Sequence, residues 1–198
     1  MPVLRLSILF LIASSMLSTI SQAQSVPTFV IPQDGSTVKF HVKASVAIDG
    51  AFDKWDATLI FTSADVTTGV LDIKVTADSV NTGSGMKNDK LKGKDFFDAK
   101  KDPYITFHST KVAQTGPNAF DITGTFTIRG VSKPETLTLT ETGTRGSGEG
   151  TIMGTMAFDR KDYGMNSGIP FIKIADRVEV DVDFQVKRVS GPPLVFKE

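Results

Sequence analysis

The sequence has two histidines, His41 and His108, which are the side chains best suited to acid–base chemistry or metal binding. Each occupies a polar position in a segment where apolar and polar residues alternate, so both are expected on the wet faces of strands. A metal site requires several His, Cys or carboxylate ligands that converge. The sequence contains no cysteine, and we predict no metal site.

The sequence also gives little support for nucleophilic catalysis or for phosphate binding. Ser84 lies in the loop TGSG with no evident base, and no G-x-S-x-G motif is present. The glycine-rich residues 146–150 precede a strand-like segment and lack the P-loop lysine. We therefore predict that the protein is not an enzyme. Alternating carboxylates near the end of the chain indicate a solvated strand face: Glu179, Asp181 and Asp183.

Two arginines stand just past the ends of predicted strands, Arg129 and Arg160. An arginine at the rim of a barrel can bind an anionic head group through a bidentate hydrogen-bonded pair. The alternative for Arg160 is an internal salt bridge with a neighbour such as Asp159 or Asp162, and we favour it.

The elements that must position these residues are strands, because apolar and polar residues alternate along most of the chain. With turn signals between the segments and no helical crossovers, the pattern predicts an all-β fold, an antiparallel barrel or sandwich of about eight strands. These segments are Thr37–Ser45, Trp55–Thr62, Val70–Val75, Tyr104–Thr110, Phe120–Ile128, Thr136–Thr140, Ile152–Phe158 and Val178–Lys187.

One segment breaks the alternation. Leu91, Phe96 and Phe97 stand among lysines and aspartates with roughly helical spacing. Pro103 disfavours the helical conformation of Asp102, so the helix must end before it. We predict a short helical insertion around residues 86–99 that covers one end of the fold as a lid or plug.

The first 23 residues have the features of a cleaved secretory signal peptide. A positively charged start is followed by an apolar run from Leu6 to Leu17, and small residues stand around Ala23. The apolar run is shorter than the roughly 20 residues of a membrane span. We therefore expect a single domain over residues 24–198 with a short C-terminal tail, in the periplasm or secreted, without an integral membrane span.

Charge argues against two classes of partner. Without the signal peptide the chain carries 21 basic and 22 acidic residues, a net charge of −1. A net charge this close to zero provides no basic surface for nucleic acid. The sequence also lacks the basic cluster that holds proteins to anionic membranes.

Six stretches, in this order and spacing, resemble the YceI-like family of periplasmic lipid-binding proteins across nearly all of residues 32–189. They are STVKFHV (36–42), GAFDKWDATLIF (50–61), ADSVNTG (77–83), KDFFDAKKDPYITFHSTKV (94–112), GTFTIRGVSK (124–133) and FDRKDYG (158–164). The resemblance implies an extended eight-stranded antiparallel β-barrel, lipocalin-like in shape, with a helical insertion after the third strand. It also implies carriage of a long isoprenoid or other amphiphilic chain, such as a polyprenyl phosphate or a quinone, with no other cofactor.

The inward residues of the strands form the predicted apolar channel, and the insertion together with one arginine forms its lid or rim. The channel residues are Phe40, Val42, Phe61, Leu71, Ile73, Phe107, Phe126, Ile128, Met156, Phe158, Val182 and Phe184. The lid or rim residues are Lys90, Leu91, Lys92, Phe96, Phe97 and Arg160.

Alternatives remain open on the sequence alone. An eight-stranded barrel has room for side chains or for one small ligand, so a structural or interaction barrel filled by its own phenylalanines is the main alternative to a carrier of isoprenoid or acyl lipid. A lipid hydrolase is the weakest alternative. The inward glycines Gly124 and Gly154 suit either a cavity or a bulge. A homodimer is also left open.

Overall fold

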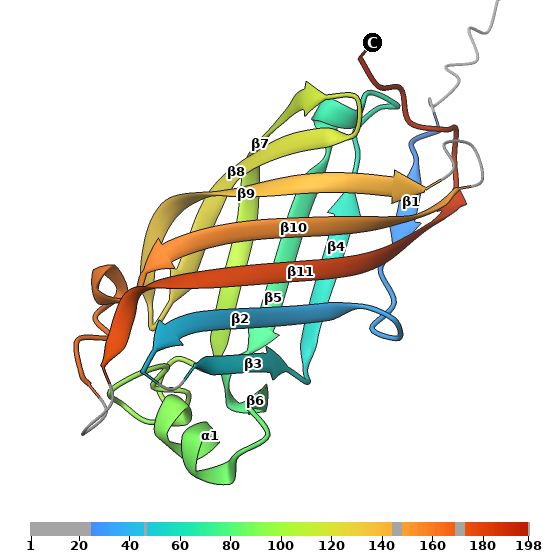
Figure 1. The fold of residues 1–198 in the computed structure, drawn as a ribbon. Coiled ribbons are helices and arrows are strands. Elements are labelled where there is room, and N and C mark those ends of the chain that lie inside the picture. Colours follow the sequence, from blue (N-terminus) through green and yellow to red (C-terminus); the bar gives the residue numbers. More distant parts are fainter. Residues whose placement is uncertain (1–24, 46, 144–147, 169–172, 198) are drawn as a thin grey trace, which may run out of the picture.

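The computed structural model describes residues 25–45, 47–143, 148–168 and 173–197. It is an elongated, closed antiparallel β-barrel with one short α-helix at one end (Figure 1). The predicted signal peptide, residues 1–23, lies outside the described residues. The strands are β1 (Thr28–Val30), β2 (Thr37–Ala44), β3 (Ile48–Phe52), β4 (Trp55–Ile60), β5 (Val70–Thr76), β6 (Val80–Asn81), β7 (Tyr104–Gly116), β8 (Ala119–Ile128), β9 (Val131–Gly143), β10 (Glu149–Asp159) and β11 (Ile174–Ser190).

Eight of these strands close the barrel in the order β1-β4-β5-β7-β8-β9-β10-β11, with β11 pairing back onto β1. The long strand β11 serves two partners along one edge. It pairs with β2 from Ile174 to Asp183 and with β1 from Lys187 to Ser190. From β2 the sheet continues through β3 to β6. The predicted all-β antiparallel barrel is confirmed.

The eight segments predicted from alternation correspond to β2, β4, β5 and β7 to β11. The three strands that the pattern missed are short: β1, β3 and β6 have 3, 5 and 2 residues. A period of two cannot be recognised in so few residues. These strands nevertheless matter, because β1 closes the barrel and β3 and β6 extend the sheet toward α1.

The helical insertion is real but shorter than residues 86–99. Helix α1 spans Gly85–Lys92, and residues 93–102 form turns. The Phe97 backbone N–H donates to the Leu91 carbonyl oxygen at 2.9 Å, which folds the turn back against the helix. Leu91, Phe96 and Phe97 are all buried. Arg129, in the turn between β8 and β9, fixes this turn by donating to the Phe96 carbonyl oxygen at 2.8 Å.

The inward glycines mark close packing and not open space. A Cβ on Gly124 would lie 2.5 Å from the His108 carbonyl oxygen, beside a β-bulge in β7. A Cβ on Gly154 would lie 2.4 Å from a Leu139 methyl group and 2.7 Å from one of Val182. Neighbouring side chains therefore occupy the room that both glycines leave.

The two histidines lie on the outer surface, as predicted. His41 contacts the Asp49 carboxylate and His108 contacts the Asp72 carboxylate, each on a neighbouring strand. Among the described residues, no three His, Asp or Glu side chains gather as metal ligands would. No helix in the described part of the chain has both the length and the apolar character to cross a membrane.

Candidate functional site

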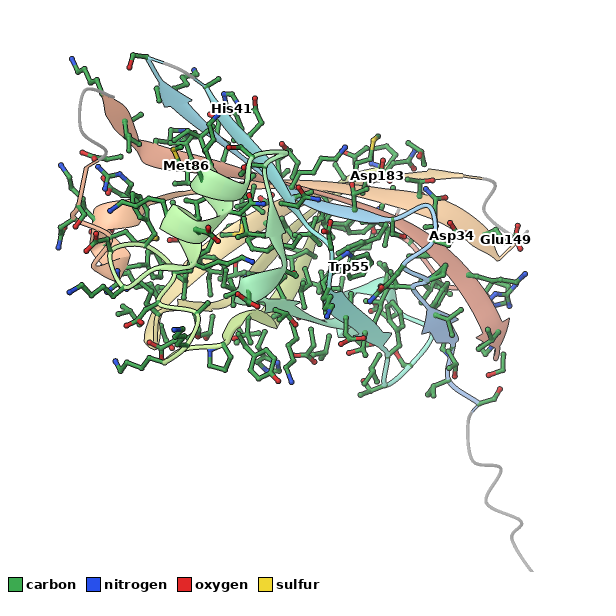
Figure 2. All side chains as sticks on the ribbon, turned by 90° about the horizontal axis from the view of Figure 1, so that it is seen from below. Asp34, His41, Trp55, Met86, Glu149 and Asp183 are labelled. Carbon is green, nitrogen blue, oxygen red and sulfur yellow. The ribbon has the colours of Figure 1, made fainter. Side chains whose placement is uncertain are left out.

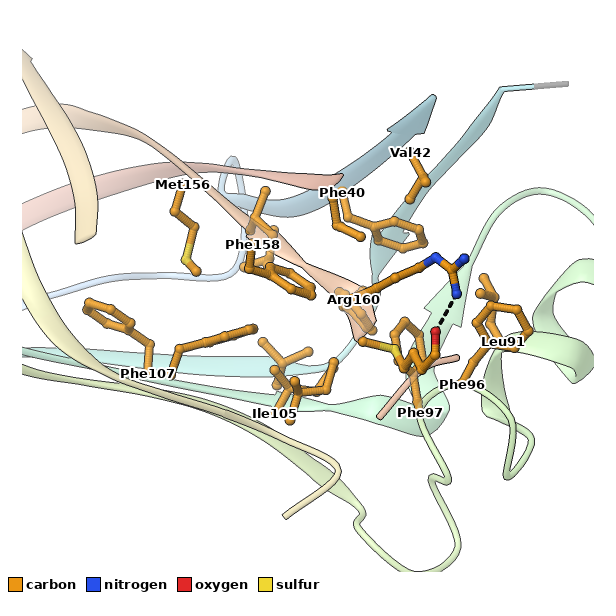
Figure 3. Close-up of a pocket in the computed structure, with 18 of the residues that line it drawn as sticks. Phe40, Val42, Leu91, Phe96, Phe97, Ile105, Phe107, Met156, Phe158 and Arg160 are labelled. Carbon is orange, nitrogen blue, oxygen red and sulfur yellow. Dashed lines mark hydrogen bonds between the residues drawn. The ribbon is translucent and has the colours of Figure 1, made fainter. Parts of the chain in front are cut away.

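Inside the barrel, the described residues surround two apolar cavities, one toward each end. The first cavity lies at the α1 end and has a volume of about 90 Å³. It is closed at that end by Leu91, Phe96 and Phe97, which extend from α1 and the following turn toward the barrel axis (Figure 3). All but two of its 24 lining residues are apolar, the exceptions being Thr106 and Arg160.

The second cavity lies at the opposite end and is larger, at about 330 Å³. Its walls come from β1, β4, β5, β7 to β11 and the 3-10 helix η1 (Val66–Thr68), and Pro193, Leu194 and Phe196 of the C-terminal tail also line it. Most of its lining is apolar. The charged side chains on it are Glu141, Glu149 and Arg188.

A packed layer separates the cavities. Successive inward residues of one strand fall on opposite sides of it: Ile73 and Leu71, or Val182 and Phe184, line the first and second cavities respectively. The Trp55 ring packs against the fully buried Phe184 ring at a centroid distance of 5.1 Å. Figure 2 shows Trp55 near the middle of the long axis, between Met86 at the helix end and Glu149 at the other. This ring pair, which we call the aromatic wall, lies in the packing between the two cavities.

All twelve predicted channel residues line a cavity, but they divide between the two. Nine line the first: Phe40, Val42, Ile73, Phe107, Phe126, Ile128, Met156, Phe158 and Val182. Three line the second: Phe61, Leu71 and Phe184. Their part in ligand binding stays a prediction.

The predicted rim residues also divide. Leu91, Phe96, Phe97 and Arg160 line the first cavity. The two lysines do not, because each forms an ion pair with a carboxylate outside it. The Lys90 ammonium lies 2.8 Å from Asp95, and that of Lys92 lies 3.5 Å from Asp78. The hydrogen bond from Lys90 is the main reason why the pKa of Asp95 is lowered.

Arg160 is buried at the start of the 3-10 helix η3 (Arg160–Tyr163). Its guanidinium donates to the carbonyl oxygens of Ala175 at 3.2 Å, of Ser167 at 3.0 Å and of Met165 (Figure 3, dashed), and to the Asp176 carboxylate at 2.9 Å. The internal salt bridge that we favoured therefore exists, but with Asp176 and not with Asp159 or Asp162. Four of the five guanidinium N–H groups are engaged by the protein itself.

Tyr163 packs behind the lining of the first cavity, and the alternation could not reveal it because it lies on η3 and not on a strand. Its ring packs edge-on against Phe126 and Phe158 at 5.4 and 5.2 Å, and it is fully buried. Its hydroxyl donates to the Glu135 carboxylate at 2.9 Å. Burial, and then this bond to a carboxylate, raise the pKa of Tyr163 far above its ordinary value, so the hydroxyl stays neutral.

Comparison with known proteins identifies the family to which this barrel is similar. The model of the YceI-like domain matches residues 29–186. A curated relative from Pseudomonas savastanoi pv. phaseolicola, named UPF0312 protein, is 28% identical over 142 residues, which cover 70% of this chain and 72% of the relative.

Solved structures of the same fold include BcnA of Burkholderia cenocepacia, with a TM-score of 0.71 and 28% identity over 79% of this chain and 98% of BcnA. The YCEI protein of Campylobacter jejuni aligns with a TM-score of 0.60 and 27% identity, over 72% of this chain and 85% of that protein. A domain from Saccharophagus degradans, described as a polyisoprenoid binding domain, has a TM-score of 0.61 but only 14% identity over 82% and 99% of the two chains. That last likeness concerns the fold alone.

Proposed function

The chain belongs to the YceI-like domain family, and we propose that it binds and carries a long-chain amphiphilic lipid inside its barrel. The ligand class that we propose is a polyisoprenoid, such as a polyprenyl phosphate or an isoprenoid quinone. The protein acts as a binding protein and not as an enzyme, and it works in the periplasm or after secretion.

The observation that carries this proposal is the apolar interior. The two cavities together extend from the α1 end to the C-terminal end of the barrel, and 22 of the 24 residues around the first are apolar. Burial of apolar surface contributes roughly 25 cal/mol per Å². An isoprenoid chain can therefore bind tightly without directed polar contacts, and the barrel length selects the chain length.

A long chain requires the two chambers to join. Small-molecule pockets usually measure about 300–1,000 Å³. The second cavity is therefore large enough for a ligand as it stands, and the first is too small. We expect the ring of Trp55 to turn away from Phe184 when a chain passes between them. Fluorescence of Trp55, the single tryptophan of the sequence, then reports binding directly.

Native mass spectrometry of the mature protein, purified without detergent and mixed with a polyprenyl phosphate or a quinone, tests the proposal. We expect a stoichiometric adduct. Phe126→Asp places a charge in the first cavity and should abolish uptake, whereas Thr125→Asp, at the adjacent exposed position of β8, should not. Uptake that is unchanged in a folded Phe126→Asp variant would remove this residue from the site.

A barrel filled by its own side chains is the alternative, and the tight aromatic packing at the α1 end favours it. Phe40, Phe52 and Phe97 form a cluster with centroid distances of 5.6 to 6.3 Å. If the wild-type protein takes up neither lipid, and carries none from its host, this alternative is correct and the search should turn to protein partners.

A further inference from the structure

The two ends of the barrel are closed in different ways. At the α1 end, buried aromatic side chains fill the interior, and the Arg129 side chain fixes the turn that carries them. At the other end, residues 191–197 (the C-terminal cover) continue from the end of β11 (Figure 1), and Pro193, Leu194 and Phe196 line the second cavity. The larger cavity thus lies against the C-terminal cover.

The C-terminal cover is held by hydrogen bonds along its length and by the Phe196 ring, which packs against Phe120 at a centroid distance of 6.1 Å. The Val195 backbone exchanges two hydrogen bonds with the loop between β4 and η1, donating to Ala64 at 2.8 Å and accepting from Val66 at 3.1 Å. Arg188 donates to the Gly191 carbonyl oxygen at 2.8 Å. Gly191 has a φ of 80°, and a Cβ there would lie 2.2 Å from the Val26 carbonyl oxygen, so only glycine fits where the cover leaves β11.

Gln114 of β7 acts as a clasp at the far end of the cover. Its side-chain amide donates to the Lys197 carbonyl oxygen at 2.9 Å and accepts from the Lys197 backbone N–H at 2.7 Å. Gln114 does not line the cavity, so the clasp is separable from the lining.

Exposed apolar side chains gather around the same end. Val26, Val30, Ile60, Val189 and Val195 are all exposed, with Ile60 at 59% and Val195 at 62%. They are neighbours because β1 pairs with both β4 and the end of β11, and the cover lies beside them. This end of the barrel thus exposes apolar side chains on its outer surface.

The charges at the mouth favour no charged head group. Arg188 lies with Glu141 and Glu149 on the lining, and the Lys187 ammonium pairs with Glu149 at 2.9 Å on the outside. Both signs are thus present and roughly balanced, whereas an isolated positive cluster would be needed to hold an anion.

We propose that the second cavity is a separate binding site for a small, uncharged, apolar molecule such as a monocyclic terpene or an aromatic hydrocarbon, which enters when the C-terminal cover lifts from Gln114. A cavity of about 330 Å³ is within the usual range for small-molecule sites. Dry apolar cavities of about half this size already bind benzene. The proposal rests on the volume and apolar lining of the second cavity alone, whereas the long-chain lipid proposed above needs both cavities.

The site is tested by titration with 1-aminoanthracene, a small uncharged aromatic dye whose fluorescence rises in apolar surroundings. Val112→Phe fills the second cavity, and Val180→Phe is the matched change in the first, since both valines are half-buried on strands. We expect saturable binding to the wild type, a loss of at least tenfold in affinity with Val112→Phe and less than a twofold change with Val180→Phe.

If Val112→Phe does not fold, as judged by circular dichroism and melting, Ile152→Phe on the opposite strand β10 replaces it. Absence of saturable binding to the folded wild type, or an equal loss with the Val180→Phe variant, overturns the second site. These outcomes are independent of polyprenyl uptake, which the mass spectrometry reports separately.

The cover is tested by rapid mixing with the same dye. Gln114→Ala removes both hydrogen bonds of the clasp, and loss of about 1 kcal/mol should raise the open fraction and the association rate about fivefold. The control is Gln185→Ala, which removes a comparable side-chain bond, from Thr151 at 3.0 Å, away from the cover. An association rate equal to that of the wild type in Gln114→Ala overturns the role of the cover.

Discussion

Replacement of Arg160 by methionine distinguishes a structural arginine from one that binds a ligand. Methionine keeps much of the aliphatic packing of the side chain against the first cavity but removes all four hydrogen bonds of the guanidinium. Three backbone carbonyl oxygens and the Asp176 carboxylate then lose a donor. We expect a stability loss with the barrel still folded.

The size of the loss follows from burial. The Arg160 side chain is only 8% exposed, and removing one partner of a buried ion pair typically costs about 3–5 kcal/mol. Asp176 is 36% exposed and keeps Lys161 at 2.7 Å, so its charge is not left stranded. The cost should therefore fall at the lower end, about 3 kcal/mol.

Urea unfolding monitored by Trp55 fluorescence measures this loss. At a typical slope of about 1–3 kcal/mol per molar urea, the midpoint should fall by roughly 1 M or more. Arg177→Met is the matched control, because Arg177 is 69% exposed and its ion pair, with Glu179, lies on the surface. Surface pairs contribute about 0–1 kcal/mol, so this control should unfold close to the wild type.

The opposite pattern would refute the reasoning. If the Arg160→Met variant unfolds at the wild-type midpoint but binds polyprenyl phosphate at least tenfold more weakly, Arg160 serves an anionic head group and not the loop around η3. A neutral quinone separates the two roles further, because its binding should be insensitive to the charge at this position.

Three other predictions concern stability. Gly154→Ala should cost about 1–3 kcal/mol in urea unfolding because its Cβ would lie 2.4 Å from a leucine methyl group, whereas Gly116→Ala, where the nearest atom is 3.4 Å away, should be nearly neutral. Ser109→Ala should cost about 1–3 kcal/mol, because the buried Leu71 N–H, which donates to the Ser109 hydroxyl at 2.8 Å, loses its acceptor. A urea midpoint equal to that of the wild type would mean that water replaces the hydroxyl. The pKa of Asp176 is lowered from 3.8, chiefly by its hydrogen bond from Lys161, so its carboxylate stabilises the fold above about pH 4 and this contribution is lost as the pH falls further. Asp176→Asn should therefore flatten the fall in unfolding free energy below pH 4. An unchanged dependence of the unfolding free energy on acid pH would contradict this.

The fold could be predicted because long strands repeat one simple signal. In β8 and β11, every second residue is apolar over ten positions or more, and a barrel that is buried on one face requires that pattern. The position of the insertion was predicted correctly, but its conformation was not. Phe96 and Phe97 have helical spacing relative to Leu91, yet they lie in a turn, because Gly93 ends the helix after Lys92.

The candidate site could be predicted in part, since inward position follows from alternation and the inward residues line the cavities. Alternation does not say how inward side chains meet across a barrel. Nothing local to Trp55 or Phe184 shows that their rings touch, because they come from strands 129 positions apart in sequence. The contacts of Arg160 were missed for the same reason: Asp176 lies 16 residues away on the next strand, whereas the expected partners were adjacent.

In both binding proposals, the wall formed by Trp55 and Phe184 sets which ligands fit. An eight-stranded barrel with an open axis would accept a long chain from either end, and its two mouths would be equivalent. The Trp55–Phe184 pair packs between the α1 chamber of about 90 Å³ and the chamber of about 330 Å³, which residues of the C-terminal cover help to line. A long lipid must therefore contribute enough apolar contact to displace two packed rings, an aromatic pair worth about 0.5–1.5 kcal/mol beyond its buried area. Short apolar molecules avoid that cost. We therefore expect this wall to restrict binding of long chains while it leaves the second cavity available to small ligands.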